Sequence, residues 1–173
     1  MRFKLPVAAL ALAFAAAATA AYGAKPNDAQ IAHIAYTAGQ IDIEAAKLAL
    51  QKSKNKEVRD FAENMIRDHT AVNNQALALV KKLNVTPEDN DTSKALVKQA
   101  DAEQAQLQKL EGPAFDKAYA DNEVDYHKEV NKALETDLIP NATNQQLKDL
   151  LAMGLKIFQG HEQHAEQVAR SLK

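Results

Sequence analysis

The sequence predicts an all-α protein, a four-helix bundle in which a shorter fifth helix makes a connection. Alanine, leucine, lysine, glutamine and glutamate dominate after residue 24, and these are strong helix formers. Apolar residues recur there at spacings of three and four, without the alternation typical of strands. The few glycines and prolines mostly stand where these periodic segments end. Together these observations exclude a fold built on sheets.

Residues 1–24 have the pattern of a cleavable signal peptide. Arg2 and Lys4 precede an apolar run over 5–21, and Ala18, Thr19 and Ala20 give the small-x-small pattern of a cleavage site. A membrane anchor is the alternative, but the run is shorter than the about 20 residues that a span needs, and half of it is alanine. We expect cleavage near residues 20–24, and 25–173 as a single helical-bundle domain. The expected location is the periplasm, with outer-membrane association or secretion as alternatives.

The first two helices of this domain are long. Apolar residues on one stripe predict a helix over 27–51. Either Ser53 or Asn55 is a suitable N-cap for the second helix, which we expect to continue to residue 83. The stretch 84–87 ends in Pro87 and stops it, because proline does not continue a helix.

The third helix is predicted over 92–110, and it is more polar, with only a thin apolar stripe. Gly112 and Pro113 mark a stop and a restart, so the fourth helix is expected over 113–137, with Pro140 as its end. Thr143 begins a capping-box pattern that opens the last helix, which runs to the C-terminus.

Four long helices and one short one favour a four-helix bundle whose third segment crosses the length of the bundle. A plain up-and-down bundle of five helices is the competing arrangement. No segment after residue 24 is apolar enough to predict a membrane span.

Charge and composition exclude several classes of function. The whole chain has a net charge of −2, and the signal peptide removes only positive charges, so no basic stripe for nucleic acid is expected. With 0 cysteines, disulfides, thiolate ligands and cysteine nucleophiles are all excluded. No glycine-rich phosphate loop is present either.

Histidines and carboxylates on different helices are the candidate ligands for a metal. His69, His127 and His161 fall beside the apolar stripes of three helices; the carboxylate candidates are Asp42 on the first helix and Glu123 one turn before His127. Bundles build metal sites from such inward side chains, and imidazole suits zinc, copper, nickel or iron. The alternative is that these histidines are hydrogen-bonded core residues.

An estimate of depth along the helices tests whether these residues meet. With 1.5 Å per residue, His69 and His127 lie roughly 21 Å from the start of their helices. Asp42 lies about ten residues before the end of the first helix, which is roughly 15 Å from that same end of the bundle. His161 is placed roughly 14 Å nearer the other end of the bundle by the same estimate. The prediction is a shared level for the first three residues and Glu123, with the place of His161 left open.

Two neighbouring patterns have weaker interpretations. His161 and His164 are three residues apart, so they share a helix face that is able to chelate a metal, although a half-exposed polar turn is the plainer interpretation. Asp68 is a candidate to orient the ring of His69 or to accept a hydrogen bond from a ligand, although consecutive helix residues do not face each other.

Three stretches resemble the signatures of a known family. They are residues 57–70, residues 115–119 with His127 further on, and Leu155, Phe158 and His161 in the last helix. The chain resembles, over 28–172, a bacterial exported family of unknown function whose members are often labelled outer membrane proteins. The resemblance implies a ferritin-like four-helix bundle in the periplasm. It implies these motif positions: Asp68, His69, Tyr119, His127 and His161. The family usually has Glu where this chain has Asp42.

The leading hypothesis is therefore a non-enzymatic or weakly catalytic bundle that binds a transition metal. A second hypothesis is a structural or stress-related protein that contacts a protein or envelope partner and needs no metal. A third, a redox enzyme, is disfavoured because diiron bundles use Glu-x-x-His pairs. Here Ile66, Val124 and Phe158 stand three residues before the histidines.

Overall fold

The computed structural model describes residues 25–172, and within that range the chain is helical and forms no strand. This confirms the predicted all-α class, whereas the predicted signal peptide lies outside the described residues. The segments, in chain order, are α1 (Asp28–Lys52), α2 (Lys56–Lys82), α3 (Asp91–Leu107), α4 (Gly112–Ala133), the π-helical turn η2 (Leu134–Leu138), α5 (Ile139–Asn141) and α6 (Gln145–Ser171).

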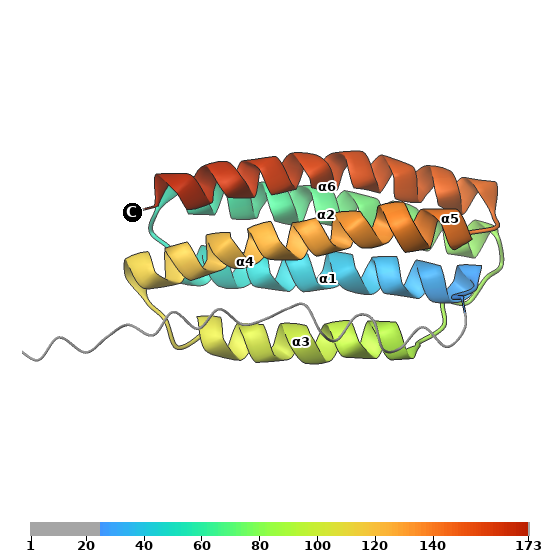
Figure 1. Ribbon diagram of the computed structural model, residues 1–173, viewed down its shortest axis with the longest axis horizontal. Coiled ribbons are helices and arrows are strands. Elements are labelled where there is room, and N and C mark those ends of the chain that lie inside the picture. The colour runs from blue at the N-terminus through green and yellow to red at the C-terminus, as the bar shows by residue number, and fades with distance from the viewer. Residues whose placement is uncertain (1–24, 173) are drawn as a thin grey trace, which may run out of the picture.

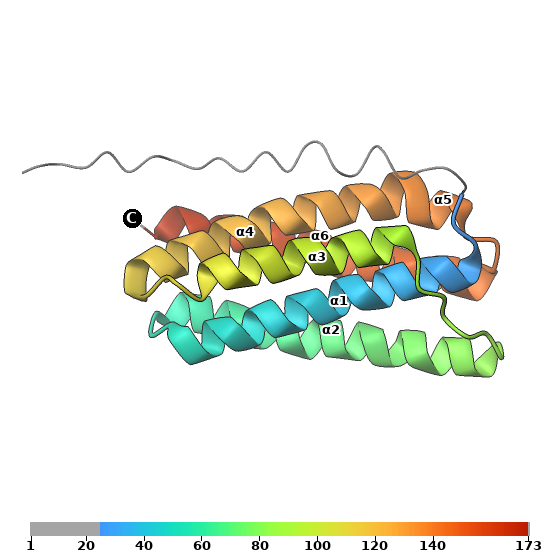
Figure 2. The ribbon, with the colours of Figure 1, turned by 90° about the horizontal axis from the view of Figure 1, so that it is seen from below.

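Four of these helices form the bundle. α1 packs against α2 and α4, and α6 packs against the other sides of α2 and α4. The shorter α3 lies outside this group, against α1 and α4, and runs back along the bundle so that α2 and α4 point in the same direction (Figure 1, Figure 2). The ferritin-like bundle with a shorter connecting helix is therefore confirmed over the five-helix alternative. No helix within residues 25–172 has the length and apolarity to cross a membrane.

Asparagine side chains begin four of the helices. Asn27, Asn55, Asn90 and Asn144 each accept hydrogen bonds from backbone N–H groups of the first turn. The predicted cap at Thr143 is wrong by one residue, because Asn144 is the N-cap of α6. The hydroxyl and the backbone N–H of Thr143 instead donate to the Asp28 carboxylate, at 2.6 and 2.7 Å. This fixes the start of α6 to the start of α1.

Pro140 does not end the fourth helix as predicted. The chain stays helical to Asn141 because it widens into η2, where the Ile139 N–H donates to the carbonyl of Leu134, five residues back. A proline ring normally collides with the carbonyl four residues before it. The wider π turn accommodates the proline, so the helix continues from α4 through η2 to α5 without a break.

The core is divided along the length of the bundle. One cluster of buried apolar residues, which includes Phe61, Met65 and Phe115, lies toward the α1–α2 loop. The other, which includes Ile31, Leu134 and Leu151, lies toward the start of α1. Between them five buried polar side chains form what we call the polar layer: Asp42, His69, Glu123, His127 and His161.

Next to the polar layer, α1 and α2 approach closely at Gly39. The amide of Asn73 crosses from α2 and donates to the Tyr36 carbonyl at 3.3 Å and to the Gln40 side chain at 3.1 Å. A Cβ atom on Gly39 would lie 2.5 Å from the Asn73 Oδ1 atom, so only glycine leaves room for this crossing.

Candidate metal centre

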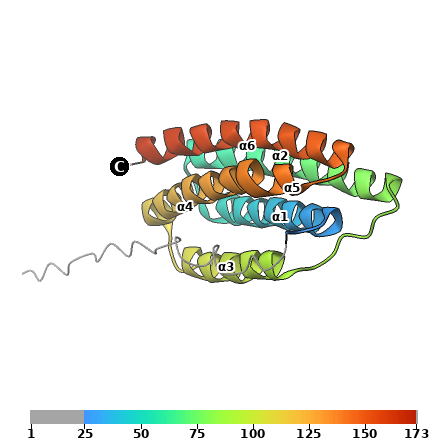
Figure 3. The same ribbon diagram turned by 45° about the vertical axis from the view of Figure 1, so that its right-hand side comes forward.

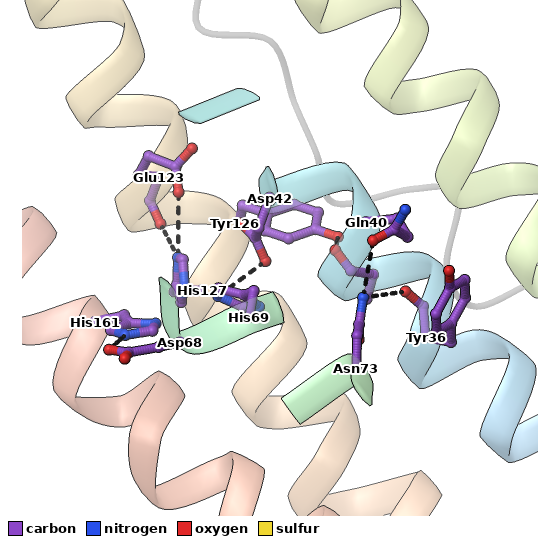
Figure 4. A network of polar contacts seen from close by, with 11 residues as sticks. Tyr36, Gln40, Asp42, Asp68, His69, Asn73, Glu123, Tyr126, His127 and His161 are labelled. Carbon is purple, nitrogen blue, oxygen red and sulfur yellow. Dashed lines mark hydrogen bonds and ion pairs between the residues drawn. The ribbon is translucent and has the colours of Figure 1, made fainter. Parts of the chain in front are cut away.

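Three helices bring three histidines together in the polar layer. His69 comes from α2, His127 from α4 and His161 from α6, and their ring centroids are 5.8, 5.1 and 5.6 Å apart (Figure 4). The exposed fractions of the three residues are 1, 1 and 6%. One possible ligand atom on each lies within 4.8 Å of those on the other two. The estimate that placed His161 roughly 14 Å away is therefore wrong.

The reason is the offset between α6 and α2: the last turn of α6 lies level with the first turn of α2. The Ser171 hydroxyl donates to the carboxylate of Glu57, in the first turn of α2. Counted from that end of the bundle, His161 is about ten residues, or about 15 Å, from Ser171. That depth is the same as the one predicted for Asp42.

Hydrogen bonds to oxygen atoms determine which nitrogen carries the proton in two of the imidazole rings. The Nδ1 atom of His127 lies 2.9 Å from the backbone carbonyl oxygen of Glu123, and the Nε2 atom of His161 lies 3.0 Å from Asp68 Oδ2. Because both oxygens only accept, these nitrogens are the donors. The opposite nitrogens, His127 Nε2 and His161 Nδ1, have no hydrogen-bond partner. Each therefore carries an unused lone pair inside the bundle.

The third ring, His69, is held by packing. Phe158 stacks on one face of it, with centroids 4.5 Å apart and planes 5° from parallel. Neither ring nitrogen makes a hydrogen bond, and the Nε2 atom lies 3.4 Å from Asp42 Oδ2. Phe158 is thus a residue of the site whose role the sequence did not indicate.

Burial keeps the histidines neutral. It lowers the pKa of His69 well below its usual value and the pKa of His127 to about 4. Burial also lowers the pKa of His161, although the hydrogen bond to Asp68 opposes this shift. Neutral imidazole is the form that binds metal ions. At neutral pH the three rings therefore need lose no proton before they bind one.

The two carboxyl groups of the polar layer lie against His127. Asp42, Glu123 and His127 form a second group whose possible ligand atoms lie within 4.8 Å of one another. Burial raises the pKa of Asp42 well above its usual value, and raises that of Glu123 to about 8. The pair therefore retains a proton near neutral pH, as expected for two neighbouring carboxyls away from water.

The remaining predicted residues lie at the edge of this centre. Asp68 accepts a hydrogen bond from His161, so the interpretation that it orients His69 is wrong, whereas the alternative role as an acceptor agrees with this contact. His164 packs edge-on against Phe61, with centroids 5.1 Å apart, and is not one of the grouped ligands. Tyr119 is fully buried and stacks on Phe115, with its hydroxyl unpartnered.

The chain belongs to the family described as a domain of unknown function, DUF4142, whose model matches residues 13–168. No curated protein matches it. Solved structures of similar fold include the following two. CopM in the Cu(II)-bound form is 14% identical with a TM-score of 0.65, over 87% of this chain and 100% of that one. A secreted DUF305 protein from Streptomyces coelicolor is 13% identical with a TM-score of 0.70, over 82% and 91%. These matches support the predicted resemblance to a bacterial exported family of unknown function.

Proposed function

We propose that this protein binds one transition-metal ion in the polar layer, through His69, His127 and His161. The observation that carries the proposal is the arrangement of the ring nitrogens. Lone pairs of His127 and His161 are unpartnered inside the bundle, while their outer nitrogens are held by a carbonyl and a carboxylate. Metal-binding histidines are oriented in this way, by an oxygen acceptor on the nitrogen that does not bind.

The carboxyl pair supplies what the three imidazoles lack. Three neutral ligands leave the charge of a divalent ion uncompensated, and a buried charge is costly unless it is paired. The Oδ2 atom of Asp42 lies 3.4 Å from His69 Nε2, so Asp42 is close enough to complete the coordination, whereas Glu123 Oε2 lies 3.6 Å from Nδ1 of His127, the nitrogen that faces the carbonyl. Metal–imidazole bonds are about 2 Å long, so the ligand atoms, which lie within 4.8 Å of one another, have to move inward to hold one ion.

The ligand set suits zinc, copper, nickel or iron, because imidazole binds all four. Copper is the first ion to test, because CopM, a protein of similar fold, has a structure in the Cu(II)-bound form. The similarity to a secreted protein and the leader-like residues 1–24 support export. We place the mature domain, 25–173, in the periplasm, as a protein that binds a metal rather than one that turns over a substrate.

The alternative without metal makes a different use of the same residues. In a structural or stress-related interaction protein the histidines only pack and hydrogen-bond in the core, as the stack of His69 on Phe158 illustrates. His69→Ala or His127→Ala would then destabilise the fold by about 1 kcal/mol or more, whether metal is present or not. Metal dependence of stability separates the two functions.

The test is elemental analysis of the mature protein purified from its native compartment, with the double variant His69→Ala/His127→Ala beside it. His33→Ala, which removes a half-buried histidine outside the polar layer, is the matched control. We expect near-stoichiometric metal in the wild type and the control, and none in the double variant. Added metal at 100 times its Kd should also stabilise the wild type by about 2.7 kcal/mol. No bound metal, together with a melting temperature that none of the four ions changes, would refute the proposal.

A further inference from the structure

A cavity of about 190 Å³ lies beneath the crossover helix, between α1, α3 and α4. Its inner end is formed by Asp42, Glu123 and Tyr126, and its outer rim by residues of α3 such as Asp101 and Glu103. Figure 3 shows α3 set apart from the four-helix group that it covers. The cavity therefore connects the surface to the carboxyl side of the polar layer.

Acidic residues, and no basic ones, line this cavity. Five carboxyl residues face it, and no lysine or arginine does; the five are Asp42, Glu44, Asp101, Glu103 and Glu123. The Oε2 atom of Glu123 is buried at the inner end without a hydrogen-bond partner. Glu44 is partly neutralised by Lys47 at 2.7 Å, which leaves Glu103 as the half-buried carboxylate at the rim. A cleft of one charge sign with apolar walls concentrates ions of the opposite sign.

The helix over the cavity is held by few buried side chains. Within α3 only Ser93 and Leu107, near its two ends, are buried. Val97, in the middle of the helix and on the cavity lining, is 44% exposed. Segments with so little buried surface open at low cost in free energy. The crossover helix is therefore able to move away from α1 and α4 while the four-helix group stays intact.

The opposite edge of the polar layer is less suitable for a cation. There His161 is 6% exposed and bonded to Asp68, and the guanidinium of Arg67 makes two contacts with the same carboxylate, at 2.7 and 3.0 Å. An incoming metal ion would meet the positive charge of Arg67 before it met a free ligand.

We infer that the cavity beneath α3 is the entry route by which a divalent cation reaches the histidines of the polar layer. This inference rests on the proposed metal binding. Glu103 attracts the ion at the rim, and Asp42 and Glu123 receive it at the inner end. The Oδ2 atom of Asp42 also lies 3.4 Å from His69 Nε2, so the ion passes from Asp42 to the imidazoles without crossing apolar core.

The experiment measures the rate at which the metal-free, full-length mature protein takes up Zn²⁺ and Cu²⁺ in a stopped-flow instrument. Glu103→Gln should load roughly three- to tenfold more slowly at low salt, and the difference should vanish at about 0.5 M salt. Its Kd at equilibrium should equal that of the wild type, because Glu103 is not a ligand. Ala100→Phe fills the cavity and should slow loading at every salt concentration. Ala102→Phe, at an exposed position of the same helix, is its matched control and should load normally.

Equal loading rates for the wild type and Glu103→Gln at low salt would overturn the inference, whatever Ala100→Phe does. So would faster loading by Arg67→Gln with no effect of Glu103→Gln, because the ion would then enter past Asp68. A wild-type protein that takes up no metal at equilibrium refutes the proposed function itself. A protein that binds metal with unchanged rates refutes only the route.

Discussion

Asp68 is the neighbour of His69 in the sequence, but its carboxylate accepts a hydrogen bond from the Nε2 atom of His161, at 3.0 Å. This contact joins α2 to α6 through a residue whose side chain is 27% exposed. Because the carboxylate only accepts, it fixes the proton of His161 on Nε2 and leaves Nδ1 free inside the bundle.

Asp68→Asn should weaken metal binding about 10- to 100-fold, as the loss of an outer partner of a ligating histidine does. The amide no longer dictates which nitrogen of His161 carries the proton. Metal affinity is measured by competition with a chelator of known strength. Asp60→Asn, on the exposed surface of the same helix, is the control. Equal affinities for both variants would show that the Asp68 contact has no part in binding.

The metal-free protein should lose stability as the pH rises from about 6.5 to 9. The pKa of Glu123 is about 8 in the folded state, above its ordinary value of 4.5, so its contribution is complete below pH 4.5 and lost as the pH passes 8. The groups that face it in the polar layer are Asp42, whose pKa is also raised, and the lowered-pKa ring of His127. Glu123→Gln stays neutral at every pH. The free energy of unfolding in urea should therefore fall between pH 6 and pH 9 by a few kcal/mol less in this variant than in the wild type. A decline as steep as that of the wild type would contradict the assignment.

The buried histidines should lower the stability of the metal-free protein as the pH falls, in contrast to Glu123. The pKa of His127 falls from 6.5 to about 4 on folding. Between these pH values His127 is therefore protonated in the unfolded chain and neutral in the folded chain. Stability from this group is present above pH 6.5 and lost as the pH falls through 4. His69→Ala/His127→Ala, less stable at pH 7, should therefore lose less than the wild type between pH 6.5 and 4. Thermal unfolding of both metal-free proteins across that range gives the comparison.

Gly39→Ala should destabilise the bundle by about 1–3 kcal/mol, because the new methyl group overpacks the α1–α2 contact. The Cβ atom would lie 2.5 Å from the amide oxygen of Asn73, which is tied to α1. Gly160→Ala is the matched control in α6, where a Cβ meets nothing within 4 Å. Helix propensity alone should make that variant up to about 1 kcal/mol more stable. In urea unfolding, the free energy of unfolding should therefore decrease for Gly39→Ala and increase for Gly160→Ala, relative to the wild type.

Local rules predicted the helices better than the places where they meet. The periodicity placed every long helix, and the short polar third segment predicted the crossover that α3 makes. Pro140 was misjudged because a proline ends a helix only if the turn before it stays α-helical. The five-residue π turn over Leu134–Leu138 depends on tertiary packing.

The candidate site could be predicted as a set of residues but not as a geometry. Helix spacing predicted that Asp42, Glu123 and His127 lie at one level, and in the structure they do lie together, while His69 groups with His127 and His161. The depth of His161 required the offset between α6 and α2, which no local pattern contains. The partner of Asp68 was likewise beyond local rules. Because consecutive helix residues point in different directions, the sequence indicated that Asp68 does not face His69, but it did not indicate His161, which lies on another helix.

The division of the core into two apolar clusters has a consequence for how the protein unfolds. In the metal-free state the two halves meet across histidines and protonated carboxyls rather than across interlocked hydrocarbon, so cooperativity between them is weakest at the polar layer. Amide hydrogen exchange should then show two opening units, one around Phe61 and Phe115 and the other around Ile31 and Leu151. A metal ion that ligates residues of several helices in this layer would merge them into one.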